Sequence, residues 1–236
     1  RDPARPWFLY LAYNAVHSPM QATDRHLEAF SHLPDIHRRI FAAMLAHLDE
    51  SVGAVLAQLH SNGLEENTLV VFLSDNGGPT RELTSGNGPL RGEKGTLFEG
   101  GIRVPFVARW PRALPAGKVV DTPVISLDLA ATVLTAAGSG SPTAELDGTD
   151  LVALVKAPSS APRTFFWRMG QRAAMREGTW KIVRDGGPRQ AGPWRLFNLA
   201  ADVGEANDLA EKDPAHLATL VKRWEEWNSQ QQAPRW

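Results

Sequence analysis

Apolar positions along the chain follow two periods, and each period predicts a different kind of element. Between residues 35 and 60, apolar side chains recur every three or four positions, which predicts a long amphipathic helix. Gly63 follows this stretch as a C-terminal cap. Short continuous apolar runs, rich in aromatic or β-branched residues, predict buried strands at residues 7–13, 68–73 and 104–108.

The order of these elements predicts the fold class. Strand, helix and strand over residues 7–73 form a right-handed βαβ unit, which implies a parallel sheet. A further helix is predicted over residues 127–137, with Ser126 as its N-cap and Gly138 at its end. We therefore expect an α/β fold with a partial, mixed or mostly parallel sheet flanked by helices.

The pattern changes after residues 138–148, a stretch rich in Gly, Ser, Pro and Thr that suggests a domain boundary. Four short strands are predicted at residues 164–169, 173–176, 179–184 and 194–197. A terminal helix begins near Asp213, before a proline suited to a first helical turn. We expect residues 1–137 to belong to the α/β domain, and residues 138–236 to form a small antiparallel α+β subdomain with a terminal helix.

Composition restricts the possible functions. The chain has 236 residues, of which 43% are hydrophobic and 22% charged, as in a soluble globular protein. A net charge of -1 gives no bulk attraction to nucleic acid or to anionic membranes. No continuous apolar run approaches the length of a bilayer, so no membrane span is expected. The absence of cysteine excludes disulfides, thiolate metal sites and cysteine nucleophiles within this chain.

The first residue is Arg1, and the apolar run at residues 7–13 follows without a signal peptide. We expect the chain to be a fragment or a processed product of a longer protein, with its targeting information upstream.

Polar side chains follow two of the predicted strands. His17 comes after the first, and Asp75 and Asn76 come after the second. Ligands of open parallel sheets bind beyond the carboxyl ends of the strands, so these residues are expected at one rim. Asp75 and Asn76 offer the oxygen ligands that calcium or magnesium prefers, although Asp-Asn-Gly-Gly is also an ordinary turn sequence. His17 can exchange a proton near neutral pH or serve as a structural residue.

Residues 87–105 are rich in glycine and carry positive charge. Glycine allows the backbone to approach a ligand closely, and Arg91 and Lys94 can attract an anion. Gly95 stands where a nucleotide-binding P-loop needs Ser or Thr after its lysine, so that motif is excluded. A flexible surface loop remains the other interpretation.

Several segments together resemble the sulfatase family, of the arylsulfatase type within the alkaline-phosphatase superfamily. Residues 74–78 (SDNGG), 89–96 (PLRGEKGT) and 99–105 (EGGIRVP) carry the resemblance most closely. The stretch from 8–10 to 17–19 and the C-terminal segments 176–181, 196–199 and 207–210 are similar to further parts of the family, in the same order.

The resemblance implies roles for individual residues. Asp75 and Asn76 match a pair of calcium ligands, and Lys94 matches a lysine that contacts the sulfate group. His17 matches a histidine near the ester oxygen, suited to proton donation to the leaving group. The implied reaction is hydrolysis of a sulfate ester on a small molecule or a glycan. The family also favours a periplasmic or secreted location.

One part of the family's chemistry is missing from this chain. Sulfatases use a formylglycine made from Cys or Ser in a Cys/Ser-x-Pro-x-Arg motif, and residues 160–163 (SAPR) come close but lack one position. We therefore expect the nucleophile to come from a missing N-terminal half of the same protein. Without that partner, the isolated chain is expected to be inactive.

Two other functions remain open. A phosphatase, phosphodiesterase or phosphonate hydrolase of the same superfamily tends to bind two transition metals through additional Asp and His ligands; the Asp75–Asn76 pair favours calcium. A degenerate sulfatase-like protein could bind sulfated glycans without cleaving them. Arg168, with Trp167 and Arg172, is a candidate contact to the substrate, although Trp167 could equally be a core residue.

Overall fold

The structure is a computed structural model that describes residues 5–80, 84–139, 146–157, 161–187 and 190–233. It contains two compact units. Unit 1 comprises Arg1–Val71, Arg81–Ser85 and Ala108–Pro158. Unit 2 comprises Phe72–Thr80, Gly86–Val107 and Ser159–Trp236. Each unit is built from several chain segments, and the predicted division after residue 137 stays a prediction.

Helices dominate unit 1. They are α1 (Asp24–Ala29), α2 (Ile36–Ser61), a 3-10 helix η1 (Glu65–Asn67), α4 (Leu127–Ala136) and α5 (Leu151–Lys156). The predicted long helix is confirmed in α2, and Asp35 caps it by accepting a hydrogen bond from Arg38 N at 2.8 Å. Gly63 ends α2 with a φ of 63°, and its N–H donates to His60 O at 2.9 Å.

By length and composition alone, α2 could cross a membrane. The expected absence of a membrane span is therefore not confirmed. The core helix of a soluble protein can have the same length and composition. Helix α2 buries Ala43, Met44 and Leu59, and it packs against α1.

The predicted strand at residues 7–13 is wrong for this structure. These residues form no strand, and large side chains among them are exposed, including Phe8 at 74% and Tyr10 at 80%. A strand requires a neighbour for its backbone N–H and C=O groups, and no described segment pairs with this run. The predicted βαβ unit is therefore not formed, and the mostly parallel sheet is not confirmed.

The predicted strands after α2 and near residue 104 are confirmed as β1 (Val70–Leu73) and β2 (Phe106–Arg109), which pair in a two-stranded sheet. Helix α4 lies where it was predicted, but Ser126 makes no side-chain capping bond. The buried Asp128 carboxylate instead ties the start of α4 to its surroundings, accepting hydrogen bonds from Ile125 N at 2.9 Å and Thr149 N at 2.8 Å.

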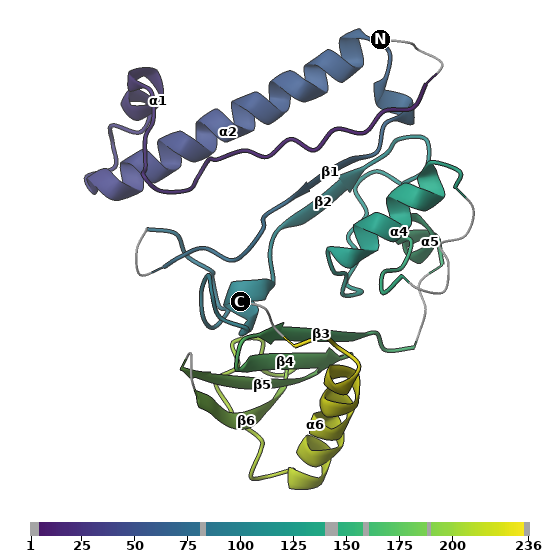
Figure 1. Ribbon diagram of the computed structural model, residues 1–236. Coiled ribbons are helices and arrows are strands. Elements are labelled where there is room, and N and C mark those ends of the chain that lie inside the picture. Colours follow the sequence, from purple (N-terminus) through teal and green to yellow (C-terminus); the bar gives the residue numbers. More distant parts are fainter. Residues whose placement is uncertain (1–4, 81–83, 140–145, 158–160, 188–189, 234–236) are drawn as a thin grey trace. The chain divides into compact units, whose positions relative to one another are not determined.

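Unit 2 contains the antiparallel sheet that the sequence predicts. Its strands are β3 (Thr164–Met169), β4 (Arg172–Glu177), β5 (Trp180–Gly187) and β6 (Gln190–Asn198), in the order β3-β4-β5-β6 (Figure 1). Helix α6 (Pro214–Ser229) runs beside this sheet. Asp213 caps α6 through His216 N at 3.1 Å, with proline in the first turn as predicted.

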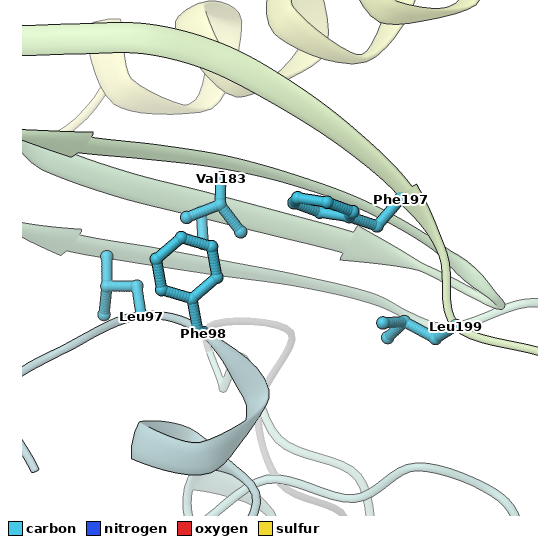
Figure 2. Packing of buried hydrophobic residues seen from close by; sticks show 6 residues of the cluster. Leu97, Phe98, Val183, Phe197 and Leu199 are labelled. Atoms are coloured by element: carbon cyan, nitrogen blue, oxygen red, sulfur yellow. The ribbon is translucent and has the colours of Figure 1, made fainter. Parts of the chain in front are cut away.

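The sheet of unit 2 packs on both faces. On one face lie α6 residues Leu220 and Trp224, against Ile182 and Leu196. On the other face, Leu97 and Phe98 pack against the sheet (Figure 2). Their partners there are Val183, Phe197 and Leu199, and the Phe98 and Phe197 rings meet edge to face at 6.4 Å.

Leu97 and Phe98 directly precede α3 (Glu99–Ile102), a short helix of unit 2 that lies within the stretch predicted as a glycine-rich loop. The sequence pattern also gave no indication of α1 and α5. The fold thus brings one face of the C-terminal sheet against the residues that open α3.

Candidate functional site

The turn after β1 places the two predicted metal ligands. Ser74 Oγ donates to Asn76 O at 2.8 Å, and Asn76 Nδ2 donates to Gly77 O at 3.1 Å. The Asn76 amide nitrogen is therefore used within the turn, and its side-chain oxygen remains an acceptor. Asp75 is exposed, and nothing in the described chain donates a hydrogen bond to its carboxylate. The two residues thus offer two oxygens that suit a hard cation.

Glycine contacts fix this turn against α3. A β-carbon on Gly77 would lie 1.7 Å from Gly100 O, so no other residue fits there without moving the backbone. Gly77 N–H donates to Gly101 O at 3.0 Å. The position of the Asp75–Asn76 pair is therefore set by backbone packed directly on backbone.

The loop that carries Lys94 packs on the same short helix. Gly100 N–H donates to Arg91 O at 2.6 Å, and a β-carbon on Gly101 would lie 2.2 Å from Thr96 O. Within the loop, Thr96 Oγ1 donates to Glu93 O at 2.8 Å. Helix α3 thus supports both the turn and the lysine loop.

Lys94 lies at the exposed tip of this loop. Gly92 and Gly95 flank the tip, each with a φ of 82°, which an L side chain rarely adopts. Arg172, the first residue of β4, donates a hydrogen bond to Gly95 O and so holds the loop against the sheet. The conformation of the loop is therefore stabilised by a hydrogen bond at its tip as well as by its glycines.

Asn87 links the turn to the lysine loop, a role that sequence reasoning missed. Its Oδ1 accepts from Gly78 N at 2.9 Å, while its Nδ2 donates to Gly78 O and Gly92 O, both at 3.0 Å. The only feature of the sequence that could have indicated this role is the position of Asn87 at the start of the glycine-rich segment. Asp75, Asn76 and Lys94 thus stand on loops that share one scaffold in unit 2.

His17 belongs to unit 1 and is exposed. Its Nδ1 lies 2.7 Å from Ser18 O, and because a carbonyl can only accept, Nδ1 carries the hydrogen in this contact. Exchange of a proton with a ligand would then use Nε2. The predicted convergence of His17 with Asp75, Asn76 and Lys94 stays a prediction.

Arg168 binds within unit 2. Its Nη1 donates to Asn228 Oδ1 at 2.7 Å, and its Nη2 donates to Gln232 O. Side chains alternate along β3, so Arg168 shares the α6 face with Phe166, while Trp167 packs with the Leu97–Phe98 cluster on the other face. Its proposed contact with substrate is untested, and its observed partners are in and just after α6.

The described residues do not make a complete metal site. Among them, no three or more His, Cys, Asp or Glu side chains are grouped so that they could hold a metal ion. Calcium takes six to eight oxygens, so Asp75 and Asn76 fit as two ligands of a larger set. The other oxygens would come from water or from groups outside the described part of the chain.

Comparison with known families identifies the chain. The family model described as Sulfatase matches residues 1–139, and the model for the C-terminal region of N-sulphoglucosamine sulphohydrolase matches residues 92–232. The chain belongs to the sulfatase family. It is therefore a member of a family of sulfate ester hydrolases, as the resemblance of its motifs implied.

Relatives and solved structures agree with this assignment. The chain is 32% identical to arylsulfatase J of Mus musculus, covering 96% of this chain and 46% of that protein. It is 37% identical to arylsulfatase A of Homo sapiens over 67% of this chain and 30% of that protein. The crystal structure of Ps i-CgsB in complex with k-i-k-neocarrahexaose matches with a TM-score of 0.87 and 36% identity, covering 100% of this chain and 52% of that chain. The chain thus spans about half or less of the length of these relatives.

Proposed function

We propose that the protein to which this chain belongs hydrolyses sulfate esters, with Asp75 and Asn76 binding a divalent cation and Lys94 binding the sulfate group. The observation that carries the proposal is the shared scaffold: α3 and Asn87 hold the Asp-Asn turn and the lysine loop together in a member of the sulfatase family. Cations placed around a sulfuryl group can stabilise the negative charge that develops in its transition state.

Asp75 and Asn76 fit the calcium that the family resemblance implies. When bound, the cation would supply positive charge against the sulfuryl oxygens. The residues of this chain contribute a carboxylate and an amide oxygen, in a turn already fixed by its own hydrogen bonds.

Lys94 supplies a positive charge at the tip of a hydrogen-bonded loop. Its ammonium group has three donors and no acceptor, which suits the oxygens of a sulfate group. Lys94→Met in the full-length protein should lower kcat for an aryl sulfate by about 10²–10³-fold, because one preorganised donor to the developing charge is lost. Lys222→Met, at an exposed lysine of α6, is the matched control and should leave kcat unchanged.

His17 is proposed to donate a proton to the leaving group through Nε2. The need for a proton depends on the leaving group: an alkoxide needs it more than a nitrophenolate does. His17→Ala should therefore slow hydrolysis of an alkyl sulfate more than hydrolysis of p-nitrophenyl sulfate. Equal losses on both substrates would remove His17 from this role.

The nucleophile is proposed to lie outside this chain. Formylglycine, which the family makes from a motif absent here, would be supplied by an N-terminal half of the same protein. The exposed apolar run at residues 7–13 supports a packing partner of this kind, because soluble proteins rarely leave such a surface uncovered.

Two results test this proposal with the 236-residue chain alone. The chain should release no sulfate from a chromogenic aryl sulfate. It should also fail to give soluble, monomeric material that unfolds cooperatively, and obtaining such material would contradict the proposed need for a partner.

A glycan is the proposed class of substrate. The complex of Ps i-CgsB with k-i-k-neocarrahexaose supports a carbohydrate ligand, since the match to that protein covers 100% of the present chain. A periplasmic or secreted location is proposed from the family resemblance; cell fractionation that finds the protein in the cytoplasm would contradict it.

The alternative reaction is hydrolysis of a phosphorus ester. The chain is 25% identical, with a TM-score of 0.60, to phosphonate monoester hydrolase of Agrobacterium radiobacter. Elemental analysis of the purified full-length protein separates the two: calcium favours the sulfatase, and two transition metals favour the phosphorus chemistry. A full-length protein that binds sulfated glycans without releasing sulfate would instead be a non-catalytic binding protein.

A further inference from the structure

A lysine with no exposure to solvent lies between α3 and the sheet of unit 2. Lys181 of β5 is 0% exposed, and its Nζ lies 2.8 Å from Glu99 Oε1 and 2.9 Å from Glu205 Oε1. Both carboxylates are buried as well, at 1% and 0% exposure. Lysine and glutamate are almost never this buried unless they are paired.

Other groups complete what we call the buried ion network, formed by Glu99, Lys181, Glu205 and Arg176. Glu205 Oε2 accepts from Glu99 N at 2.6 Å, and Arg176 Nη1 lies 3.5 Å from Glu99 Oε2. The exposed Arg103 lies farther away, with Nη1 3.9 Å from the same oxygen. Two carboxylates and two cations therefore balance in charge inside the unit.

Burial of these charges is not an efficient way to gain stability. Removing charged groups from water costs several kcal/mol per ion, and well-packed apolar residues would often stabilise a protein as well or better. The pKa values agree with this cost: burial raises the pKa of Glu205 against the opposing effect of Lys181, and burial lowers the pKa of Arg176. The arrangement calls for an explanation other than stability.

The network specifies where α3 sits on the sheet. Apolar contacts such as Phe98 on Val183 have no direction and tolerate small displacements. The network has direction, since the oxygens of Glu99 and its backbone N–H each face a defined partner. A displacement of α3 along the sheet would leave a buried charge unpaired, which is far more costly than loss of an apolar contact.

Helix α3 passes this position on to the candidate site. Glu99 is its first residue, and the next two are Gly100 and Gly101. Those glycines contact the Asp75–Asn76 turn through Gly77 and the Lys94 loop through Arg91 and Thr96, at distances where even one carbon atom could not be added. Backbone contacts this close transmit a shift of α3 to both ligand-bearing loops.

We propose that Lys181 is a positioning residue for the candidate cation and sulfate site, acting through Glu99 and α3. This inference rests on the proposed function. Lys181 contacts neither ligand; it sets the register of α3 on the C-terminal sheet, and α3 sets the positions of Asp75, Asn76 and Lys94. The C-terminal sheet is thereby part of the site's support.

Calcium affinity tests this inference without relying on turnover. In the full-length protein, Lys181→Met should weaken calcium binding, measured by isothermal titration calorimetry, by about 10-fold or more, as for other residues that orient metal ligands. The matched control is Arg184→Met on the same strand. Arg184 lies on the opposite face, over Trp194 and Trp224, so its loss should change calcium affinity by less than about 2-fold.

Hydrogen exchange provides a second readout, because it reports on the contact between α3 and the Asp75–Asn76 turn. Gly77 N–H is hydrogen-bonded to Gly101 O, so its hydrogen exchange should become faster in Lys181→Met and stay unchanged in Arg184→Met. If Lys181→Met does not fold, Glu205→Ala replaces it. That variant keeps the Lys181–Glu99 pair and removes the bond to Glu99 N–H, and it should still weaken calcium binding several-fold.

Each outcome decides one question. A wild-type protein that binds no calcium overturns the proposed function. A wild type that binds calcium, together with a Lys181 variant that binds it as tightly as the Arg184 variant, overturns the positioning role alone. The same holds for a Glu205→Ala variant with unchanged affinity.

Discussion

At the scale of single residues, the candidate site depends on glycines whose lack of a β-carbon allows close backbone contacts. Gly77, Gly100 and Gly101 have no side chains, and this lets the turn, α3 and the lysine loop share backbone contacts. The polar side chain of Asn87 then bridges what the glycines bring together. The candidate site residues Asp75, Asn76 and Lys94 are thus placed by the packing of these glycines and the hydrogen bonds of Asn87.

Gly77→Ala tests the close contact at this turn. The new β-carbon would lie 1.7 Å from the backbone oxygen of Gly100, which cannot move as a flexible side chain could. We expect a loss of at least about 1–3 kcal/mol in the free energy of unfolding, measured with urea on the full-length protein. Gly53→Ala in α2 is the control, with nothing within 4 Å of the added carbon; it should stabilise the helix by about 0.5–1 kcal/mol. Equal effects of the two changes would show that the turn is not tightly packed.

The buried ion network predicts a pH dependence at Glu205. Burial raises the pKa of this carboxyl above its ordinary 4.5, so the folded state keeps the proton to higher pH than the unfolded chain does. Stability contributed by this group is present at low pH and is lost as pH rises through the raised pKa. Glu205→Gln cannot titrate but can still accept from Glu99 N–H, so its free energy of unfolding should decline less than that of wild type from pH 4.5 to neutrality. Parallel pH profiles would refute the raised pKa.

At the scale of elements, the alternation of strand side chains decides which residues can serve the site. On β5, Lys181 and Val183 face α3, while Ile182 and Arg184 face α6. Arg168 falls on the α6 face of β3 and bonds to Asn228, as its place in the alternation requires. Arg172, at the start of β4, reaches the lysine loop.

Helix α6 should contribute to stability through one face only. Leu220→Ala removes a side chain that is 2% exposed against the sheet and should cost about 2–5 kcal/mol in urea unfolding of the full-length protein. Lys222→Ala, on the same helix, removes an exposed side chain and should stay within about 0.5 kcal/mol of wild type. Comparable losses from both would mean that α6 is not packed as described.

Periodicity predicted the elements whose pattern is local. The helix after Asp35 and the four C-terminal strands follow from spacing and turn residues in neighbouring positions. Helix α3 was missed because its glycines disfavour helix, and only packing against the turn and the loop explains them. The burial of Lys181 could not be predicted from local pattern, because its partner Glu99 stands 82 positions earlier in the chain.

At the scale of the whole molecule, the chain belongs to the sulfatase family and matches only part of the length of its relatives. It spans 46% of arylsulfatase J and 52% of Ps i-CgsB. The run at residues 7–13 has the sequence of a buried strand but lies exposed without a pairing partner in the described chain. Burial and sheet pairing depend on what surrounds a segment. The sequence pattern of this run therefore could not predict that it would be exposed and unpaired in this structure.

The residue roles came from motifs, and the structure explains how some of them are placed. Asp75, Asn76 and Lys94 were expected near one another because their motifs resemble the sulfatase family, and α3 and Asn87 supply the physical connection. The expected approach of His17 to these residues stays a prediction, because spacing and motif order within the chain do not determine it.

A crystal structure of the full-length protein with calcium and a sulfate ion tests the central claim most directly. We expect oxygens of Asp75 and Asn76 at about 2.3–2.6 Å from the calcium ion. Lys94 Nζ and His17 Nε2 should lie within about 3.2 Å of the sulfate oxygens. A structure in which these four side chains stand in separate regions, around no common ligand, would contradict the proposed sulfatase site.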